Sequence, residues 1–181
     1  MSVLTATAAP VISTGSMPQE THKPSHPDTF KVVFTPGEFM SSLISLKDFK
    51  KGDVVTMITG YIPSERTRTS IQVGLRQHVE WNTDMVFAQH SCNPNLGVDL
   101  QYENKDEWRV VALRDIKVGD YLTWFYPSTE WDAWGGGFPC SCGTSRCIGH
   151  YKGGKGMTLE QLATYEYINP HIIDLHKLED A

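Results

Sequence analysis

The stretch from Gln89 to Asn95, which reads Gln-His-Ser-Cys-Asn-Pro-Asn, is the most specific run in the chain. It follows the apolar residues 85–88, Met-Val-Phe-Ala, and precedes a strand-like run that begins at Leu96. Asn, Pro and Ser at this density favour a turn, and a lone histidine beside them is usually an ordinary core or surface residue. The stretch also contains Cys92, so its meaning depends on where the other cysteines lie.

The chain has four cysteines, and three of them, Cys140, Cys142 and Cys147, follow the spacing C-x-C-x₄-C. A disulfide between Cys140 and Cys142 would close a strained ring, whereas three thiolates this close together suit a tetrahedral zinc ion. Such an ion needs a fourth ligand, and Cys92 is the one cysteine left. We therefore predict one structural Zn²⁺ held by these four residues; the alternative is four ordinary buried thiols.

The composition indicates one globular unit, because 181 residues with 40% hydrophobic and 20% charged side chains suffice for a single core. A net charge of −5 argues against direct nucleic-acid binding, which needs clustered Lys and Arg. Short basic pairs such as Arg66 with Arg68 are interpreted as solvated loop charges. There is no apolar run of about 20 residues for a membrane span and no secretory signal. We therefore expect a cytoplasmic or nuclear protein without membrane contacts, where thiolates stay free for metal.

The sequence divides into three parts. Residues 1–28 are rich in Ser, Thr, Pro and Ala and are expected to form a flexible arm. Residues 29–134 contain short β-type runs separated by turns, at 29–34, 40–46, 54–62, 71–81, 96–102, 108–116 and 121–126. Residues 135–181 begin with three glycines as a joint, continue with the cysteine cluster and end in a helical segment. That helix starts at a capping box, Thr158 to Gln161, and is expected to stop at Pro170, with a weaker helix over 171–178.

Three separated motifs, in the right order, resemble those of the SET-domain protein lysine methyltransferases that carry a cysteine-rich post-SET segment. The family's Asn-His-Ser-Cys-x-Pro-Asn corresponds to residues 89–95, and its Gly-Glu-Glu-Leu-Thr-Tyr-Asp-Tyr to residues 119–126. Its post-SET C-x-C-x₄-C corresponds to residues 140–147, and the family's fourth zinc ligand falls on Cys92. Residues 126–132, Tyr-Pro-Ser-Thr-Glu-Trp-Asp, resemble a small, fungal-type, single-domain group.

The resemblance implies a mainly β fold, the β-clip or SET fold. We expect several small sheets, a pseudoknot-like core joining the His90 and Tyr126 segments, a zinc-bound post-SET module and a short C-terminal helix. It also implies S-adenosylmethionine (AdoMet) as the methyl donor and a lysine-bearing protein or peptide as the acceptor. Tyr126 takes the catalytic position, where its hydroxyl orients the amine, and Trp124 and Phe125 take positions in the substrate channel. The cofactor-side positions fall on Met40, Ser41, Ser42, Gln89 and His90.

The departures from the family pattern fall on the cofactor side. The family's Gly-x-Gly, which lets the backbone approach AdoMet, is replaced here by Met40, Ser41 and Ser42. The family's Asn at the start of the first motif is Gln89, one methylene longer, while His90 is retained. Trp124 stands where a Phe or Tyr usually tunes how many methyl groups are transferred.

Two other functions compete with lysine methylation. In the first, the same fold holds a small molecule in a biosynthetic pathway, as a methyltransferase or as a cofactor-independent cyclase that pre-orients one reactive conformer. In the second, the zinc and the knot support a non-catalytic interaction surface. The altered cofactor positions motivate the first of these, and the sequence is silent on oligomeric state.

Overall fold

The computed structural model describes residues 22–37 and 39–179, and it is mainly β, as the sequence predicted. Within these residues the strands form four small sheets. The five-stranded sheet has the order β3 (Val54–Met57), β9 (Arg109–Ala112), β8 (Leu96–Asp99), β10 (Thr123–Trp124), β7 (Gln89–His90). The other sheets pair β1 (Phe30–Val33) with β2 (Ser42–Ser45), β11 (Phe138–Pro139) with β12 (His150–Tyr151), and β4 (Ile62–Ser64) with β6 (His78–Glu80) and β5 (Ser70–Gln72).

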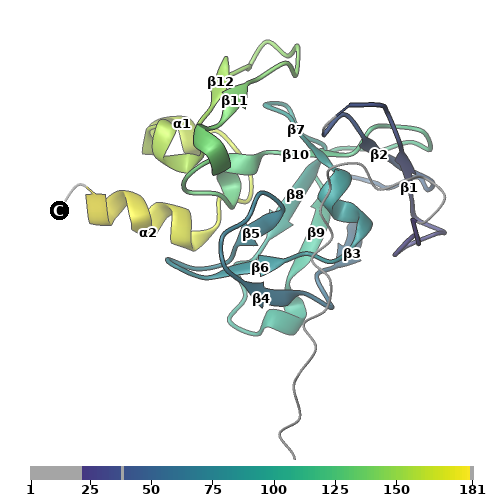
Figure 1. The fold of residues 1–181 in the computed structure, drawn as a ribbon, viewed down its shortest axis with the longest axis horizontal. Coiled ribbons are helices and arrows are strands. Elements are labelled where there is room, and N and C mark those ends of the chain that lie inside the picture. The colour runs from purple at the N-terminus through teal and green to yellow at the C-terminus, as the bar shows by residue number, and fades with distance from the viewer. Residues whose placement is uncertain (1–21, 38, 180–181) are drawn as a thin grey trace, which may run out of the picture.

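The helices are short and most lie near the C-terminus. They are the 3-10 turns η2 (Asp84–Phe87), η3 (Lys105–Glu107), η4 (Tyr126–Ser128), η5 (Trp134–Gly136) and η6 (Gly154–Gly156), followed by α1 (Leu159–Leu162) and α2 (Pro170–Glu179). Figure 1 shows α1, α2, β11 and β12 gathered on one side of the molecule, away from β1 and β2. None of the helices among the described residues has the length and apolarity that crossing a membrane requires.

The main hydrophobic core lies around β8 and β9. All four residues of β8 are buried, and so are three of the four in β9, as expected for central strands covered on both faces. Asp99 is buried among them because Arg109 of the neighbouring strand pairs with its carboxylate at 3.1 Å. This core fixes the edge of the sheet on which β10 and β7 lie.

The His90 and Tyr126 segments lie side by side, as the resemblance implied. Strand β10 runs parallel to both β7 and β8, with Thr123 opposite Gln89 and Trp124 opposite His90. The buried Asn95 locks the arrangement, since its side chain accepts from the Thr123 N–H at 2.9 Å and donates to the Tyr121 carbonyl at 2.8 Å. Two segments more than thirty residues apart are thereby held in one place.

Three local predictions are corrected by the structure. The run 71–81 is a hairpin, β5 and β6, because residues 73–77 turn the chain, with the Val73 N–H bonded to the Gln77 carbonyl at 2.9 Å. The capping box at Thr158 is present, but α1 ends at Leu162, and Pro170 begins the longer helix α2 instead of stopping one. Proline suits a first helical turn, where its missing N–H has no partner to lose.

The expected flexible arm falls mostly outside the described residues. Of residues 1–28, the structure describes 22–28, and these contact the domain. Ser25 and Asp84 exchange two hydrogen bonds, of 3.1 Å and 2.8 Å, which anchor this segment beside η2. Ordered contacts therefore begin before Thr29, the residue near which the sequence predicted that order would start.

The glycine joint before the cysteine cluster is a turn that is closely packed at its last residue, Gly137. Gly135, Gly136 and Gly137 all have positive φ, which other residues rarely adopt. A Cβ on Gly137 would overlap the Tyr151 carbonyl oxygen, so glycine is required there by contact as well as by conformation.

Candidate active site

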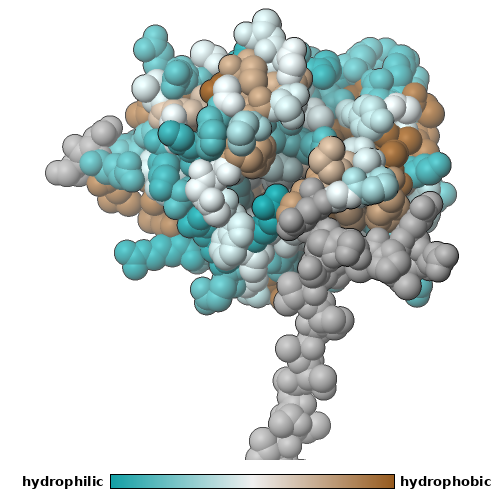
Figure 2. Space-filling view, turned by 45° about the horizontal axis from the view of Figure 1, so that its top comes forward, coloured by the Kyte–Doolittle hydropathy of each residue, from teal (hydrophilic) through white to brown (hydrophobic). Residues whose placement is uncertain are grey.

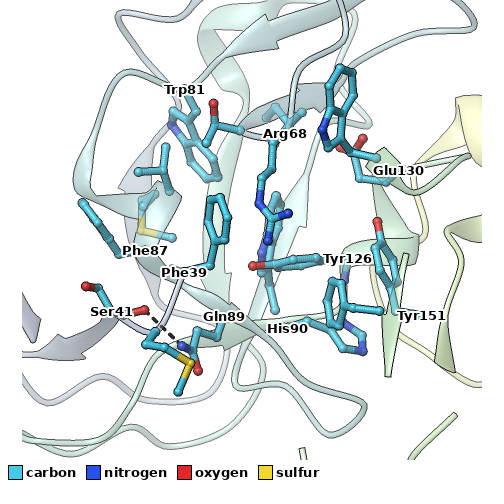
Figure 3. Close-up of a pocket in the computed structure, with 18 of the residues that line it drawn as sticks. Phe39, Ser41, Arg68, Trp81, Phe87, Gln89, His90, Tyr126, Glu130 and Tyr151 are labelled. Carbon is cyan, nitrogen blue, oxygen red and sulfur yellow. Dashed lines mark hydrogen bonds between the residues drawn. The ribbon is translucent and has the colours of Figure 1, made fainter. Parts of the chain in front are cut away.

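A cavity of about 1140 Å³ lies between the N-terminal sheets and the C-terminal module. Its wall combines residues from the loop after β1, from β5 and the segment before it, from β7 and β10, and from β11 and β12. Figure 3 shows side chains from these separate elements pointing into one space. Figure 2 shows hydrophobic and hydrophilic residues interspersed on the face it views, without a broad apolar area. The cavity is therefore the concave feature of the described residues from which we argue function.

Four of the five predicted cofactor-side residues line this cavity: Met40, Ser41, Gln89 and His90. The Gln89 amide donates to the Ser41 carbonyl at 3.0 Å, so the longer side chain bridges β7 and the loop before β2 (Figure 3). Met40 is 56% exposed at the rim. Ser42 is not at the cavity, because it belongs to β2, where it is buried opposite Val33.

His90 is a neutral, fully engaged imidazole. Its Nδ1 accepts from the Tyr126 backbone N–H at 3.3 Å, and its Nε2 lies 3.4 Å from the Cys92 sulfur. Burial lowers the pKa of His90 to about 4. Its ring packs edge-on against Tyr126 with centroids 5.3 Å apart, so it supports the tyrosine and links it to the cysteine cluster.

Tyr126 stands at the centre of the wall, with its hydroxyl donating to the Ala88 carbonyl at 3.0 Å. Burial raises the pKa of Tyr126 to about 12, so the phenol keeps its proton at neutral pH. Because the proton points toward Ala88, the oxygen lone pairs remain to accept from a group in the cavity. The geometry suits a residue that orients an amine without removing its proton.

Trp124 and Phe125 point in opposite directions, since successive strand residues face opposite sides. Trp124 lines the cavity and packs edge-on against Tyr126, with ring centroids 5.4 Å apart. The Trp124 indole N–H lies near enough to the Tyr126 phenol to oppose the rise in the pKa of that phenol. Among the described residues, this N–H has no hydrogen-bond partner of normal geometry. Phe125 is absent from the lining: its ring is stacked on that of Tyr165 with the centroids 3.6 Å apart, so the structure places it away from this cavity.

Several lining residues were not predicted, and the arginines are the clearest correction. Arg68, interpreted as a solvated charge, places its guanidinium 3.2 Å from the centre of the Phe39 ring inside the cavity (Figure 3). Arg66 also lines the cavity and is held by Asp132 at 3.1 Å and by the Ala133 carbonyl at 2.9 Å. Their sequence signal was weak, because two arginines in a polar run are typical of any surface loop.

Glu130 is the other important residue that sequence reasoning missed. It lines the cavity four residues after Tyr126, and burial raises the pKa of its carboxyl to about 7. One of its oxygens accepts from the Gln72 backbone N–H at 2.8 Å. The signal available was its place four residues after the predicted catalytic tyrosine, close enough in sequence to share its surroundings.

The four cysteines meet as predicted. Their sulfur atoms all lie within 4.8 Å of one another, and those of Cys92 and Cys140 are 3.7 Å apart. A tetrahedral site with zinc–sulfur bonds of about 2.3 Å requires sulfur separations of about 3.8 Å, so the donor set fits one Zn²⁺. Burial raises the pKa of Cys92 to about 11, so metal binding would displace its proton. Cys140 and Cys142 also line the cavity, which places the cluster directly behind its wall.

Comparison with known proteins supports the same family. A SET-domain profile matches residues 40–127. Two histone-lysine N-methyltransferases match shorter stretches. The H3 lysine-36 specific enzyme of Chaetomium globosum is 39% identical over 74 residues, 40% of this chain and 8% of its own length. The met-2 enzyme of Caenorhabditis elegans is 35% identical over 68 residues, 35% of this chain and 5% of its own.

Among solved structures, KRYPTONITE in complex with mCHH DNA, H3(1-15) peptide and SAH is 21% identical with a TM-score of 0.46, covering 61% of this chain and 27% of that one. A much longer match is methyltransferase flvH of Aspergillus flavus, 39% identical over 154 residues that span 84% of each chain. Because that identity extends over nearly the whole molecule and includes the SET motifs, this chain belongs to the SET-domain methyltransferases.

Proposed function

We propose that this protein transfers the methyl group of AdoMet to an amine nitrogen held beside Tyr126, with a lysine side chain of a protein or peptide as the first-choice acceptor. One observation carries the proposal. A single cavity brings together the cofactor-side residues Ser41, Gln89 and His90 with the acceptor-side residues Trp124 and Tyr126. Methyl transfer needs donor and acceptor in one enclosed space with their reacting atoms aligned.

SET-domain methyltransferases use AdoMet, and the residues of this cavity fit it. Its volume, about 1140 Å³, exceeds that of a typical ligand pocket, so there is room for a nucleoside and an acceptor together. The Ser41 and Gln89 segment would hold the amino-acid end, and His90 would border the adenine. When bound, AdoMet supplies a methyl group on a sulfonium, so that a carbon–nitrogen bond forms as the carbon–sulfur bond breaks.

The chain's own residues supply alignment and a dry environment. The Tyr126 oxygen, whose proton is directed at Ala88, accepts from the amine and fixes its direction. Trp81, Trp124 and Tyr151 supply aromatic surface to the cavity wall, which would favour the neutral form of an amine held beside Tyr126. The zinc cluster is assigned a structural role, because four protein ligands leave no open position for chemistry.

A small-molecule amine is the second candidate acceptor. The observation that favours it is the breadth of the cavity, in which donor-side and acceptor-side residues share one compartment. A lysine side chain needs only a slender passage, whereas this space admits a compact ring or branched amine. Both candidates share the chemistry at nitrogen and differ in what must fit around it.

The test is transfer of a labelled methyl group from AdoMet by the zinc-loaded protein. Acceptors would be a pool of lysine-containing histone-tail peptides and, separately, a panel of small primary and secondary amines. We expect transfer to at least one acceptor, reduced about 100-fold or more by Tyr126→Phe, the scale of losing one well-placed polar group at a reacting centre. Tyr121→Phe is the matched control, since Tyr121 is 60% exposed. Full activity in the Tyr126→Phe variant would remove the tyrosine from the mechanism.

A further inference from the structure

Glu130 is held in a fixed position beside Tyr126. Its backbone N–H bonds to the Tyr126 carbonyl at 2.9 Å, and its own carbonyl accepts from Gly154 at 2.7 Å. The chain turns between these residues, and both side chains line the cavity. Figure 3 shows Glu130, Tyr126 and Tyr151 along the same side of the cavity.

The Glu130 carboxyl has a hydrogen bond that orients it, but among the described residues it has no ion-pair partner. One oxygen accepts from the Gln72 N–H at 2.8 Å, and the Gln72 side chain in turn accepts from the Trp131 N–H at 3.0 Å. Among residues 22–37 and 39–179, no cationic nitrogen lies within 4.0 Å of this carboxyl. The nearby Arg66 is committed to Asp132. A partly buried carboxylate without an ion-pair partner is destabilised, so a cationic ligand in the cavity would relieve this cost.

The other polar groups around the cavity cannot easily take a proton from an incoming ammonium. The Tyr126 phenol is already protonated and donates to Ala88. Both nitrogens of His90 are engaged. The groups that face Glu130 are Arg66 from the segment before β5, Tyr126 from η4 and Tyr151 from β12, and Arg68 lines the same space. None of these four groups is an anion, so Glu130 is the carboxylate among them that can accept a proton.

We propose that Glu130 is the residue that binds the acceptor as a cationic ammonium and removes its proton before methyl transfer. This inference deepens the proposed function and rests on it. It assigns the substrate class as a basic amine that arrives protonated, whether on a lysine or on a small molecule. Burial raises the pKa of the carboxyl to about 7, which makes it a suitable proton acceptor near neutral pH.

The ammonium R–NH₃⁺ and the Glu130 carboxylate form an ion pair, and one proton passes to the carboxylate, giving R–NH₂ and a neutral Glu130 acid. The freed nitrogen lone pair forms the new bond to the methyl carbon, and the electrons of the carbon–sulfur bond remain on sulfur as S-adenosylhomocysteine (SAH). The methylated nitrogen carries the positive charge, and Glu130 returns its proton to solvent after product release.

The experiment measures binding of n-butylamine, a minimal alkylammonium, to the SAH-loaded protein by tryptophan fluorescence between about pH 5 and about pH 9. We expect the affinity of the wild type to rise as Glu130 ionises, and Glu130→Gln to lower it about tenfold at the upper end and flatten the profile. Glu130→Asp should keep a pH-dependent profile. Glu160→Gln, an exposed change of the same charge, should match the wild type. Neutral n-butanol should bind wild type and Glu130→Gln alike.

Several outcomes separate the two levels of the proposal. If the wild type does not bind SAH, the proposed function fails. If SAH binds but n-butylamine does not, or if Glu130→Gln binds it as tightly as the wild type with the same pH profile, the role of Glu130 is overturned and the methyltransferase site stands. Circular dichroism of each variant verifies that the fold is intact, and Glu130→Gln keeps an oxygen for the Gln72 N–H.

Discussion

Two hydrophobic clusters among the described residues are stabilised differently. The larger cluster surrounds β8 and β9 and contains most of the buried aliphatic and aromatic residues. The smaller consists of Phe125, Met157, Leu162 and Ile172 with a few partly buried neighbours. Because the stabilisation from apolar burial grows with the area buried, the first cluster contributes much more to stability than the second. The C-terminal region needs additional ties.

Two such ties are visible. The cysteine cluster joins Cys92 of the main domain to the three cysteines of the C-terminal region. The fully buried Asn169 donates to the carbonyls of Val98 and Ser128 at 3.0 Å and 2.9 Å and accepts from Leu100 at 2.8 Å. Because the cavity takes one wall from each region, its shape depends on the weaker one.

The largest effect should come from removing the metal. Chelation of the zinc-loaded protein is expected to unfold residues from about 135 onward while the five-stranded sheet persists, because ligand binding and folding are coupled in small metal sites. Limited proteolysis should then cut the C-terminal region rapidly, and circular dichroism should retain the strand signal. Metal-saturated chelator is the control. A chelated protein whose C-terminal region stays protected would show that apolar packing and Asn169 suffice there.

A smaller effect concerns Glu130, which lies where the two regions meet. Burial raises the pKa of its carboxyl from 4.5 to about 7, so the folded state holds the proton more tightly than the unfolded chain. Protonation therefore stabilises the fold, and this contribution is lost as pH rises from about 4.5 to about 7. The Glu130→Gln side chain does not ionise, so the variant does not show this loss. Above pH 7, the free energy of unfolding of the variant minus that of the wild type should therefore be larger than the same difference in acid by as much as about 3 kcal/mol.

Urea unfolding of both proteins at a series of pH values measures this difference. Glu160→Gln serves again as the exposed control and should follow the wild type at every pH. A Glu130→Gln difference that does not vary with pH would mean that the carboxyl is well solvated. In that case its proposed contact with a cationic substrate would lose its electrostatic basis.

The features predicted from sequence were those with fixed spacing. Cysteines at 140, 142 and 147 left few alternatives to a shared ligand, and the count of four pointed to Cys92. The prediction that the His90 and Tyr126 segments pair came from the family resemblance. The hydrogen bonds of Asn95 that hold these segments together join residues far apart in sequence, so no local sequence pattern indicates them. Pro170 illustrates the local limit, because a proline is compatible both with the stop of one helix and with the first turn of the next, and the structure places it at the start of α2.

The features missed were those that depend on the third dimension. Phe125 and Trp124 are adjacent, and only the orientation of β10 decides which of them faces the cavity. In the sequence Arg68 is typical of a surface charge, and only the folded structure places its guanidinium over the Phe39 ring. Glu130 is an ordinary acid in a polar run, and its raised pKa comes from a burial that residues distant in sequence create.

The most direct test of the central claim is a calorimetric titration of the zinc-loaded protein with SAH. The cavity that joins Ser41, Gln89 and His90 to Tyr126 predicts saturable one-to-one binding, with a Kd of about micromolar. Absence of binding to the folded, metal-loaded protein would contradict the assignment of this cavity as a methyl-transfer site.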